Sequence, residues 1–183
     1  WVIRENVKVV GVSYTGPDGP GTLSADLVVA CDGRSSLLRR EAGLRPEEFP
    51  VPMDAWWFRL PRHLTEQAET GGLRAQFRAG ELLLQINRGD YWQIAYLARK
   101  GIDPQLRAEG VAKFRERIAR INPELADRVD QLESMDDVKV LDVKLDRLHQ
   151  WHIDGLLCIG DAAHAMSPIG GVGINLAIQD AVA

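Results

Sequence analysis

Alternating apolar and polar positions predict a β-hairpin near the start of the chain. Residues 7–14 alternate in hydrophobicity, a turn rich in glycine and proline follows, and a second strand is expected over residues 22–30. Within that second strand, the run Leu-Val-Val-Ala-Cys at residues 27–31 is entirely apolar, which is typical of a strand buried on both faces. A short helix is expected after it, ending at Gly43.

The middle of the chain carries strand signals. Four apolar runs, the last three separated by tight turns that contain glycine, predict an antiparallel sheet. In the last run Trp92, Ile94 and Tyr96 share one face, because side chains alternate along a strand. The four predicted strands cover residues 55–60, 73–78, 81–87 and 91–98.

Helical spacing follows the predicted sheet. Asp103-Pro104 starts an amphipathic helix whose apolar residues recur at spacings of three and four up to Ile121. Asn122-Pro123 starts a second, short helix in the same way. The remaining predicted elements are a half-exposed strand at residues 138–148, a buried strand at residues 155–159 and a helix at residues 174–183.

Composition and charge narrow the classes of protein that remain. The 183 residues are 45% hydrophobic and 26% charged, which excludes disordered, collagen-like and coiled-coil chains and fits one domain, or one domain with a subdomain. The net charge of −4 offers no positive field for nucleic acid, and no apolar run approaches the roughly 20 residues that span a bilayer. We therefore expect no nucleic-acid partner and no integral membrane span.

The cysteines and the chain ends add two expectations. Cys31 and Cys158 lie in apolar, strand-like runs, which suits reduced thiols and predicts a cytoplasmic protein. The chain begins with Trp1, and its last predicted helix stops without a glycine cap. We therefore expect a fragment of a longer protein.

The strongest chemical signal lies in the last quarter of the chain. Asp161 follows a predicted buried strand, where open α/β sheets bind ligands, and its carboxylate can accept hydrogen bonds from sugar-like hydroxyls. A glycine cluster at residues 170–173 opens onto the last helix, so its backbone can approach a flat ligand while N–H groups face an anionic atom. The same residues also fit a plain strand, turn and helix that bind nothing.

This stretch resembles the second flavin motif of the FAD-dependent aromatic hydroxylases, the family of para-hydroxybenzoate hydroxylase. The family pattern Gly-Asp-Ala-Ala-His, Pro, Gly-x-Gly-x-Asn and Asp-Ala is matched at almost every position between Gly160 and Ala181. The resemblance implies that Asp161 binds the ribityl chain and that Pro168, the candidate catalytic residue, lies beside the isoalloxazine ring. The implied flavin contacts are Gly160, Asp161, Pro168, Gly171, Val172, Gly173, Ile174 and Asn175.

A second motif supports the same family. The segment Asp-Gly-Arg-Ser-Ser-Leu-Leu-Arg at residues 32–39 resembles the family's Asp-Gly-x-x-Ser-x-x-Arg, which is linked to FAD and to the nicotinamide cofactor. Cys31 departs from the alanine that family members usually carry. The resemblance adds Asp32, Gly33 and Arg39 to the expected cofactor site. The family's N-terminal Gly-x-Gly-x-x-Gly fingerprint does not occur in this chain.

Aromatic side chains in the middle of the chain are candidates for a substrate site. Trp56, Trp57, Trp92 and Tyr96 lie on two predicted strands, and aromatic faces suit flat substrates. The same residues also fit the core between a sheet and a helix. No metal site is expected, since the pair His149 and His152 lies at a strand end, and a serine nucleophile lacks the Gly-x-Ser-x-Gly elbow.

Together these signals predict an α/β fold with an α+β insert. Residues 1–45 and 151–183 are expected to form parts of a Rossmann-type FAD-binding domain, and residues 46–150 an antiparallel-sheet substrate domain with helices. The resemblance implies an FAD-dependent monooxygenase that uses NADH or NADPH and O2 to hydroxylate an aromatic or similar electron-rich small molecule. The alternatives are a related FAD-dependent reductase or halogenase, or a catalytically silent folded fragment. A homo-oligomer is left open.

Overall fold

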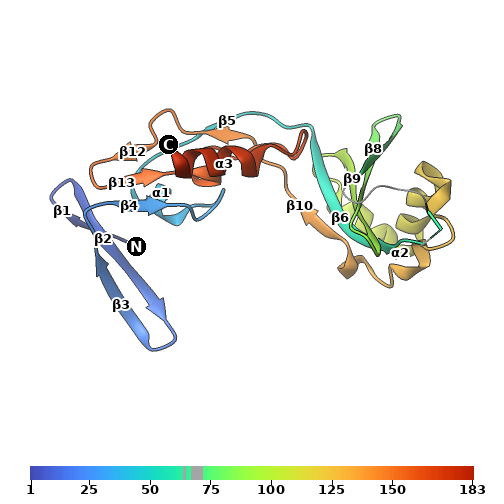
Figure 1. The fold of residues 1–183 in the computed structure, drawn as a ribbon, viewed down its shortest axis with the longest axis horizontal. Coiled ribbons are helices and arrows are strands. Elements are labelled where there is room, and N and C mark those ends of the chain that lie inside the picture. The colour runs from blue at the N-terminus through green and yellow to red at the C-terminus, as the bar shows by residue number, and fades with distance from the viewer. Residues whose placement is uncertain (64, 67–71) are drawn as a thin grey trace. The chain divides into compact units, whose positions relative to one another are not determined.

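The chain folds into two compact units (Figure 1). The computed structural model describes residues 1–63, 65–66 and 72–183. Unit 1 consists of Trp1–Val51 and Lys144–Ala183, and unit 2 consists of Pro52–Val143. The borders of unit 2 fall a few residues inside the insert that the sequence suggests at residues 46–150.

Unit 1 begins with a three-stranded antiparallel sheet. Its strands are β1 (Val2–Glu5), β2 (Lys8–Gly16) and β3 (Gly19–Ser24), in the order β1-β2-β3. Gly19 follows the turn between β2 and β3 with a backbone φ of 108°, a conformation that favours glycine. The predicted hairpin is confirmed, but its second strand ends at Ser24 rather than at residue 30.

A second small sheet in unit 1 pairs strands that are far apart in the sequence. Strand β4 (Val28–Ala30) runs parallel to β13 (Leu156–Cys158), and β12 (His152–Ile153) lies antiparallel on the other side of β13 (Figure 1). The prediction of one strand over residues 22–30 is therefore wrong, because the chain leaves the hairpin and joins a different sheet. The prediction that this strand is buried on both faces is also wrong, since Val29 in β4 is 43% exposed.

The rest of unit 1 surrounds the parallel pair of β4 and β13. Both predicted helices of this unit are present, as α1 (Leu37–Glu41) and α3 (Gly173–Val182). A two-residue strand, β5 (Glu47–Glu48), pairs with β11 (Asp146–Arg147), and the 3₁₀ turn η4 (Gly160–Ala162) follows β13. The buried core of the unit consists of Val9, Val28, Ala30, Leu148, Leu156, Cys158, Ala162 and Ala163.

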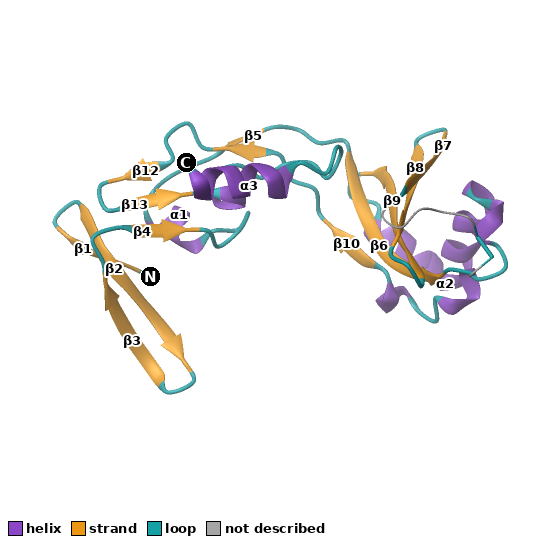
Figure 2. Cartoon of the chain, viewed as in Figure 1, coloured by secondary structure: helices purple, strands orange, loops and turns teal. Residues whose placement is uncertain are grey.

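Unit 2 is built on a five-stranded antiparallel sheet in the order β10-β6-β9-β8-β7 (Figure 2). The four predicted strands and their antiparallel pairing are confirmed. The prediction of one strand over residues 138–148 is wrong, since its two ends pair in different sheets, one in each unit. The strands are β6 (Met53–Pro61), β7 (Leu73–Arg78), β8 (Glu81–Asn87), β9 (Tyr91–Arg99) and β10 (Lys139–Leu141).

The helical segment α2 (Asp103–Ile121) packs on one face of this sheet (Figure 2). It is not one continuous helix as predicted, because Gly110, with φ 81° and ψ 170°, is non-helical and kinks it. It starts at the predicted Asp103-Pro104 and ends before Asn122, whose side chain caps the short helix η1 (Pro123–Leu125) as expected. Two further 3₁₀ turns follow in this unit, η2 (Val129–Gln131) and η3 (Met135–Asp137). Across the described residues, no helix combines the length and the apolar character that crossing a membrane requires.

Candidate functional site

Two neighbouring parallel strands bring distant segments of unit 1 to one edge of a sheet. Strand β4 ends at Ala30, which pairs with Cys158 at the end of β13, and the Ile159 N–H donates to the Ala30 carbonyl at 3.0 Å. Asp32 follows the first strand and Asp161 follows the second. Since open α/β sheets bind ligands outside the carboxyl ends of their parallel strands, this edge is the candidate site.

Asp32 is held by the helix that follows it. Its Oδ2 accepts hydrogen bonds from the N–H groups of Leu37 at 2.8 Å and Leu38 at 3.2 Å, so the carboxylate caps the start of α1. Partial burial alone would raise its pKa, but hydrogen bonds from the Ser36 hydroxyl and from these N–H groups lower the pKa of Asp32 below its ordinary value. Asp32 therefore has a structural role beside the candidate site.

Asp161 differs from Asp32 because its carboxylate has no partner among the residues that the structure describes. It is exposed in the turn η4, and within the part of the chain that the structure describes no group hydrogen-bonds to its side chain. The backbone just before it is fixed, since the Gly160 N–H donates to Asp180 Oδ2 at 2.8 Å. A Cβ on Gly160 would come within 3.2 Å of the Ala177 Cβ in α3. A carboxylate with unused lone pairs on a fixed backbone suits a ligand that carries hydroxyls.

Asp180 is an anchoring residue to which the sequence predictions assign no role. Its Oδ2 also pairs with His164 Nε2 at 2.7 Å, and the His164 ring lies against Trp151 with ring centroids 5.1 Å apart. The sequence does carry a signal for it, because Asp180-Ala181 is the last element of the family pattern and Asp180 shares one face of α3 with Ala177. Among the residues described, no group of three or more His, Cys, Asp or Glu side chains gathers where it could hold a metal ion.

The glycine cluster forms a turn with open space beside its backbone. The Gly171 N–H donates to the Pro168 carbonyl at 3.1 Å, and Gly170 and Gly171 have φ values of 89° and 63°. A Cβ on Gly33, Gly170 or Gly171 would meet no atom within 4 Å. At Gly173, whose φ lies outside the left-handed region, a Cβ would meet only the Met166 Cβ at 4.0 Å. The residues that the structure describes do not fill this space, which fits a backbone that a ligand approaches closely.

The start of α3 offers apolar surface together with backbone donors. The N-cap residue, Val172, makes no side-chain capping hydrogen bond to the first turn. Ile169, Val172 and Ile174 are 54%, 40% and 70% exposed, and Asn175 is exposed beside them. An apolar ring with a polar, electron-rich edge matches this combination, so the residues present fit a flavin.

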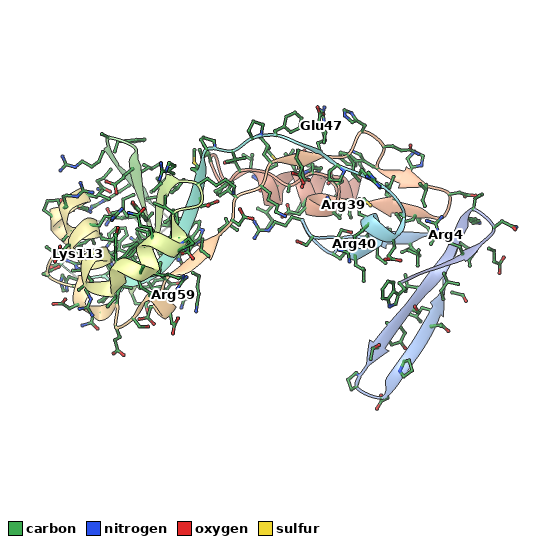
Figure 3. All side chains as sticks on the ribbon, turned by 180° about the vertical axis from the view of Figure 1, so that it is seen from behind. Arg4, Arg39, Arg40, Glu47, Arg59 and Lys113 are labelled. Carbon is green, nitrogen blue, oxygen red and sulfur yellow. The ribbon has the colours of Figure 1, made fainter. Side chains whose placement is uncertain are left out.

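Arg39, an expected cofactor contact, is instead engaged with the backbone of its own chain. It is 8% exposed, and its guanidinium donates to the carbonyls of Ala162 at 3.1 Å and Arg34 at 2.9 Å. Its place on α1 is labelled in Figure 3. It also pairs with Asp146 Oδ1 at 3.5 Å. Asp146 lies at a polar position of the run 138–148, and polar positions of a half-exposed strand normally face solvent, but Asp146 is 4% exposed.

Three of the four candidate substrate aromatics belong to the core of unit 2. Trp56, Trp92 and Tyr96 are at most 1% exposed and lie on the face of the sheet that packs against α2. The Tyr96 ring lies 5.8 Å from the Phe114 ring of α2, and its hydroxyl donates to Glu81 Oε1 at 2.6 Å. Burial, together with the hydrogen bond to Glu81, raises the pKa of Tyr96 to about 12. The structure therefore places these three side chains in the sheet-to-helix core.

Trp57 lies on the opposite face of the same sheet, because neighbouring residues of a strand point to opposite sides. It pairs with Ala95 on β9, which in turn pairs with Leu84 on β8. Trp57 and Leu84 are partly exposed, and Phe77, on the edge strand β7, is 76% exposed. We call the apolar surface of Trp57, Leu84 and Phe77 the open face; Ala95, between Trp57 and Leu84, is itself only 1% exposed.

The chain is similar to a named monooxygenase over its whole length. It is 40% identical to 6-methylpretetramide 4-monooxygenase from Streptomyces rimosus over 100% of this chain and 43% of that protein. The chain thus spans less than half the length of this relative.

Solved structures show the same fold. A probable FAD-dependent monooxygenase from Pseudomonas aeruginosa, PqsL, superposes with a TM-score of 0.74 at 24% identity, over 100% of this chain and 50% of that one. The flavin-dependent brominase Bmp2 superposes with a TM-score of 0.76 at 18% identity, over 99% of this chain and 46% of that one. The predicted α/β class with antiparallel sheets is confirmed.

A family model described as an FAD binding domain matches residues 2–183. That match includes the parallel pair β4 and β13, the Asp32 and Asp161 segments that follow it, and the glycine turn before α3. The chain therefore belongs to the family of FAD binding domains.

Proposed function

We propose that the whole protein to which this chain belongs is an FAD-dependent monooxygenase that hydroxylates an aromatic or similar electron-rich small molecule, with NADH or NADPH as reductant. One observation carries the proposal. Two motif segments, far apart in the sequence, follow adjacent parallel strands and so reach the same edge of a sheet. The similarity to 6-methylpretetramide 4-monooxygenase supports the reaction class.

In this proposal unit 1 holds the cofactor. The exposed Asp161 carboxylate accepts hydrogen bonds from ribityl hydroxyls, and the start of α3 directs backbone N–H groups at the electron-rich edge of the ring. Gly171 and Gly173 allow the backbone to lie close to that edge, and Pro168 lies beside the ring. When bound, FAD supplies the redox chemistry with the nicotinamide cofactor and O2, and the protein binds, orients and excludes water.

Unit 2 is proposed to hold the substrate, on the open face. Trp57 offers a partly exposed aromatic surface, and Leu84 and Phe77 extend the apolar area along the sheet. Trp56, Trp92 and Tyr96 are covered by their own unit, so their contribution is to the stability of the sheet that carries Trp57. An apolar aromatic surface suits a flat, electron-rich substrate.

The test uses the whole protein. We expect the purified protein to show a flavin absorption spectrum. We also expect some members of a panel of aromatic compounds to stimulate nicotinamide oxidation, and the product to incorporate oxygen from isotopically labelled O2. A protein that binds no flavin would overturn the proposal. Flavin reduction without any oxygenated product indicates a reductase. A product that appears only with added halide indicates a halogenase, an outcome included because the brominase Bmp2 has the same fold.

We propose a cytoplasmic location, because both cysteines are free thiols and Cys31 is exposed. Cell fractionation that recovers the protein outside the cytoplasm would contradict this. Size-exclusion chromatography of the whole protein tests whether it is the homo-oligomer that the sequence leaves open.

A further inference from the structure

The Arg39 side chain joins the two motif segments of unit 1. One Nη donates to the carbonyl of Ala162, which follows Asp161 directly, and the other donates to the carbonyl of Arg34 in the first motif segment. Arg39 and Ala162 are separated by 123 residues in the sequence. This single guanidinium therefore connects the turn after β4 with the turn after β13.

Asp146 completes this connection from outside both motifs. Its Oδ1 lies 3.5 Å from Arg39 Nη1 and accepts a hydrogen bond from the Ala165 N–H at 3.3 Å. The Asp146 backbone N–H donates to the Ala165 carbonyl at 3.0 Å. The side chain of Asp146 thus balances the charge of Arg39 and, at the same time, holds the backbone at Ala165.

The backbone held by these contacts carries the proposed flavin contacts. Arg39 acts at Ala162 and Asp146 acts at Ala165, and these two positions lie between Asp161 and Pro168. Ala162 and Ala165 are 0% and 2% exposed, so neither can be reached by a ligand. The contacts of the pair at Ala162 and Ala165 therefore fix the position of the segment between Asp161 and Pro168.

We propose that Arg39 and Asp146 are positioning residues that direct Asp161 at the ribityl chain of FAD. This inference rests on the proposed function, because it assigns the pair to the same flavin site. Neither residue touches the cofactor. The pair holds the backbone of residues 162–165 by hydrogen bonds that apolar side chains cannot replace.

The free-energy cost of replacing one or both residues of the pair distinguishes a positioning role from a role in fold stability alone. A buried ion pair costs desolvation, and replacing both partners by apolar residues of similar volume is often neutral or stabilising. Removing one partner alone leaves a buried, unpaired charge and is strongly destabilising. A pair needed only for packing would thus be fully replaced by Met and Leu, whereas a positioning pair would not.

The experiment compares Arg39→Met, Asp146→Asn, Asp146→Leu and the double variant Arg39→Met/Asp146→Leu in the whole protein. Thermal unfolding of the apoprotein measures stability. FAD titration measures the affinity of the site, and the reduction potential of the bound flavin measures how the site holds the ring. Hydrogen exchange in residues 160–168 of the apoprotein reports the segment without any cofactor. Glu47→Gln is the control, because it removes a carboxylate of the same unit from half-exposed pairs with Arg147 and His149.

The double variant leaves no buried charge unpaired and is expected to unfold at a higher temperature than Arg39→Met or Asp146→Leu alone. It should still bind FAD about tenfold or more weakly than wild type, with a shifted potential and faster exchange at residue 165, because hydrogen bonds to charged groups contribute about 1.5–3 kcal/mol. Asp146→Asn keeps an acceptor for the Ala165 N–H and should lose less affinity than Asp146→Leu. Glu47→Gln should change none of these quantities.

The inference is overturned if the stable double variant keeps wild-type FAD affinity, potential and exchange. If the single variants do not fold, the double variant still decides between the two outcomes. A wild-type protein that binds no FAD would overturn the proposed function and this inference together, whereas wild-type binding with unaffected variants overturns this inference alone.

Discussion

A substitution at Gly173 tests whether FAD lies against the backbone at the start of α3, because the substitution itself should not destabilise the fold. It is the first residue of α3, and its φ lies outside the left-handed region that alanine avoids. A Cβ at this position would meet only the Met166 Cβ, at 4.0 Å, which is an ordinary contact. The change Gly173→Ala therefore introduces neither a clash nor backbone strain, and it should leave the apoprotein's stability unchanged or raise it by up to about 1 kcal/mol.

A flavin lying against this backbone would meet the added methyl group directly. Inserting a methyl group into a close-packed contact typically costs about 1–3 kcal/mol, which corresponds to a loss of FAD affinity of about fivefold to about a hundredfold. A bound flavin that shifts away from the start of α3 also loses the helix dipole that stabilises its reduced, negatively charged edge. We therefore expect weaker binding and a lower reduction potential at unchanged apoprotein stability.

The assay titrates FAD into the apo form of the whole protein and follows flavin fluorescence, with thermal unfolding of each apoprotein measured in parallel. Gly171→Ala is the matched comparison, because a φ of 63° adds backbone strain of about 1–2 kcal/mol and should lower both stability and affinity. Gln179→Ala, on the exposed part of α3, should lower neither. A Gly173→Ala protein with wild-type affinity and potential would refute the reasoning, because the backbone at this position would not contact the ring.

Three further predictions follow from the described contacts. Asp161→Asn should weaken FAD binding by about tenfold without changing apoprotein stability, since the carboxylate has no partner within the described residues; a loss of stability would point to a structural role. Tyr96→Phe should lower the free energy of unfolding by about 1–2 kcal/mol and leave the KM for the aromatic substrate unchanged, whereas Trp57→Ala should raise that KM. The reverse pattern would mean that the substrate binds on the face of the sheet that carries Tyr96. The pKa of Asp32 is lowered in the folded state, so its carboxylate stabilises the fold fully above the ordinary aspartate pKa of about 3.9, and this stabilisation is lost as the pH falls through the lower folded pKa. In this acidic range the free energy of unfolding of Asp32→Asn should depend less on pH than that of wild type.

Local patterns were sufficient where the partners of an element are its neighbours in the sequence. The strands β7 and β8 begin and end at the predicted residues because alternation and the turn at Gly80 specify them locally. The start of α2 at Asp103 follows in the same way from the proline at its first turn. The candidate flavin segments were accessible through the resemblance of residues 32–39 and 160–181 to family patterns, because such patterns depend only on residue type and order.

Pairing between distant segments was not accessible from these patterns. The run at residues 27–31 is apolar in either sheet, and only its parallel pairing with β13 shows that it leaves the hairpin. Asp146 occupies a polar position in an alternating run, which indicates exposure unless a buried cation lies nearby. That cation, Arg39, lies in a different motif, and the three-dimensional fold alone brings the two together.

The sequence by itself determined the four central strands and their antiparallel pairing, the hairpin near the start of the chain, the helices that follow the two sheets and the residues that resemble a flavin site. It did not determine which face of the central sheet is covered, because Trp56 and Trp57 are equally apolar and adjacent in the chain. The packing of α2 buries Trp56, Trp92 and Tyr96 and leaves Trp57 on the other side. That choice belongs to the tertiary structure, because a strand presents apolar side chains to both faces and only a non-local partner decides which face becomes the core.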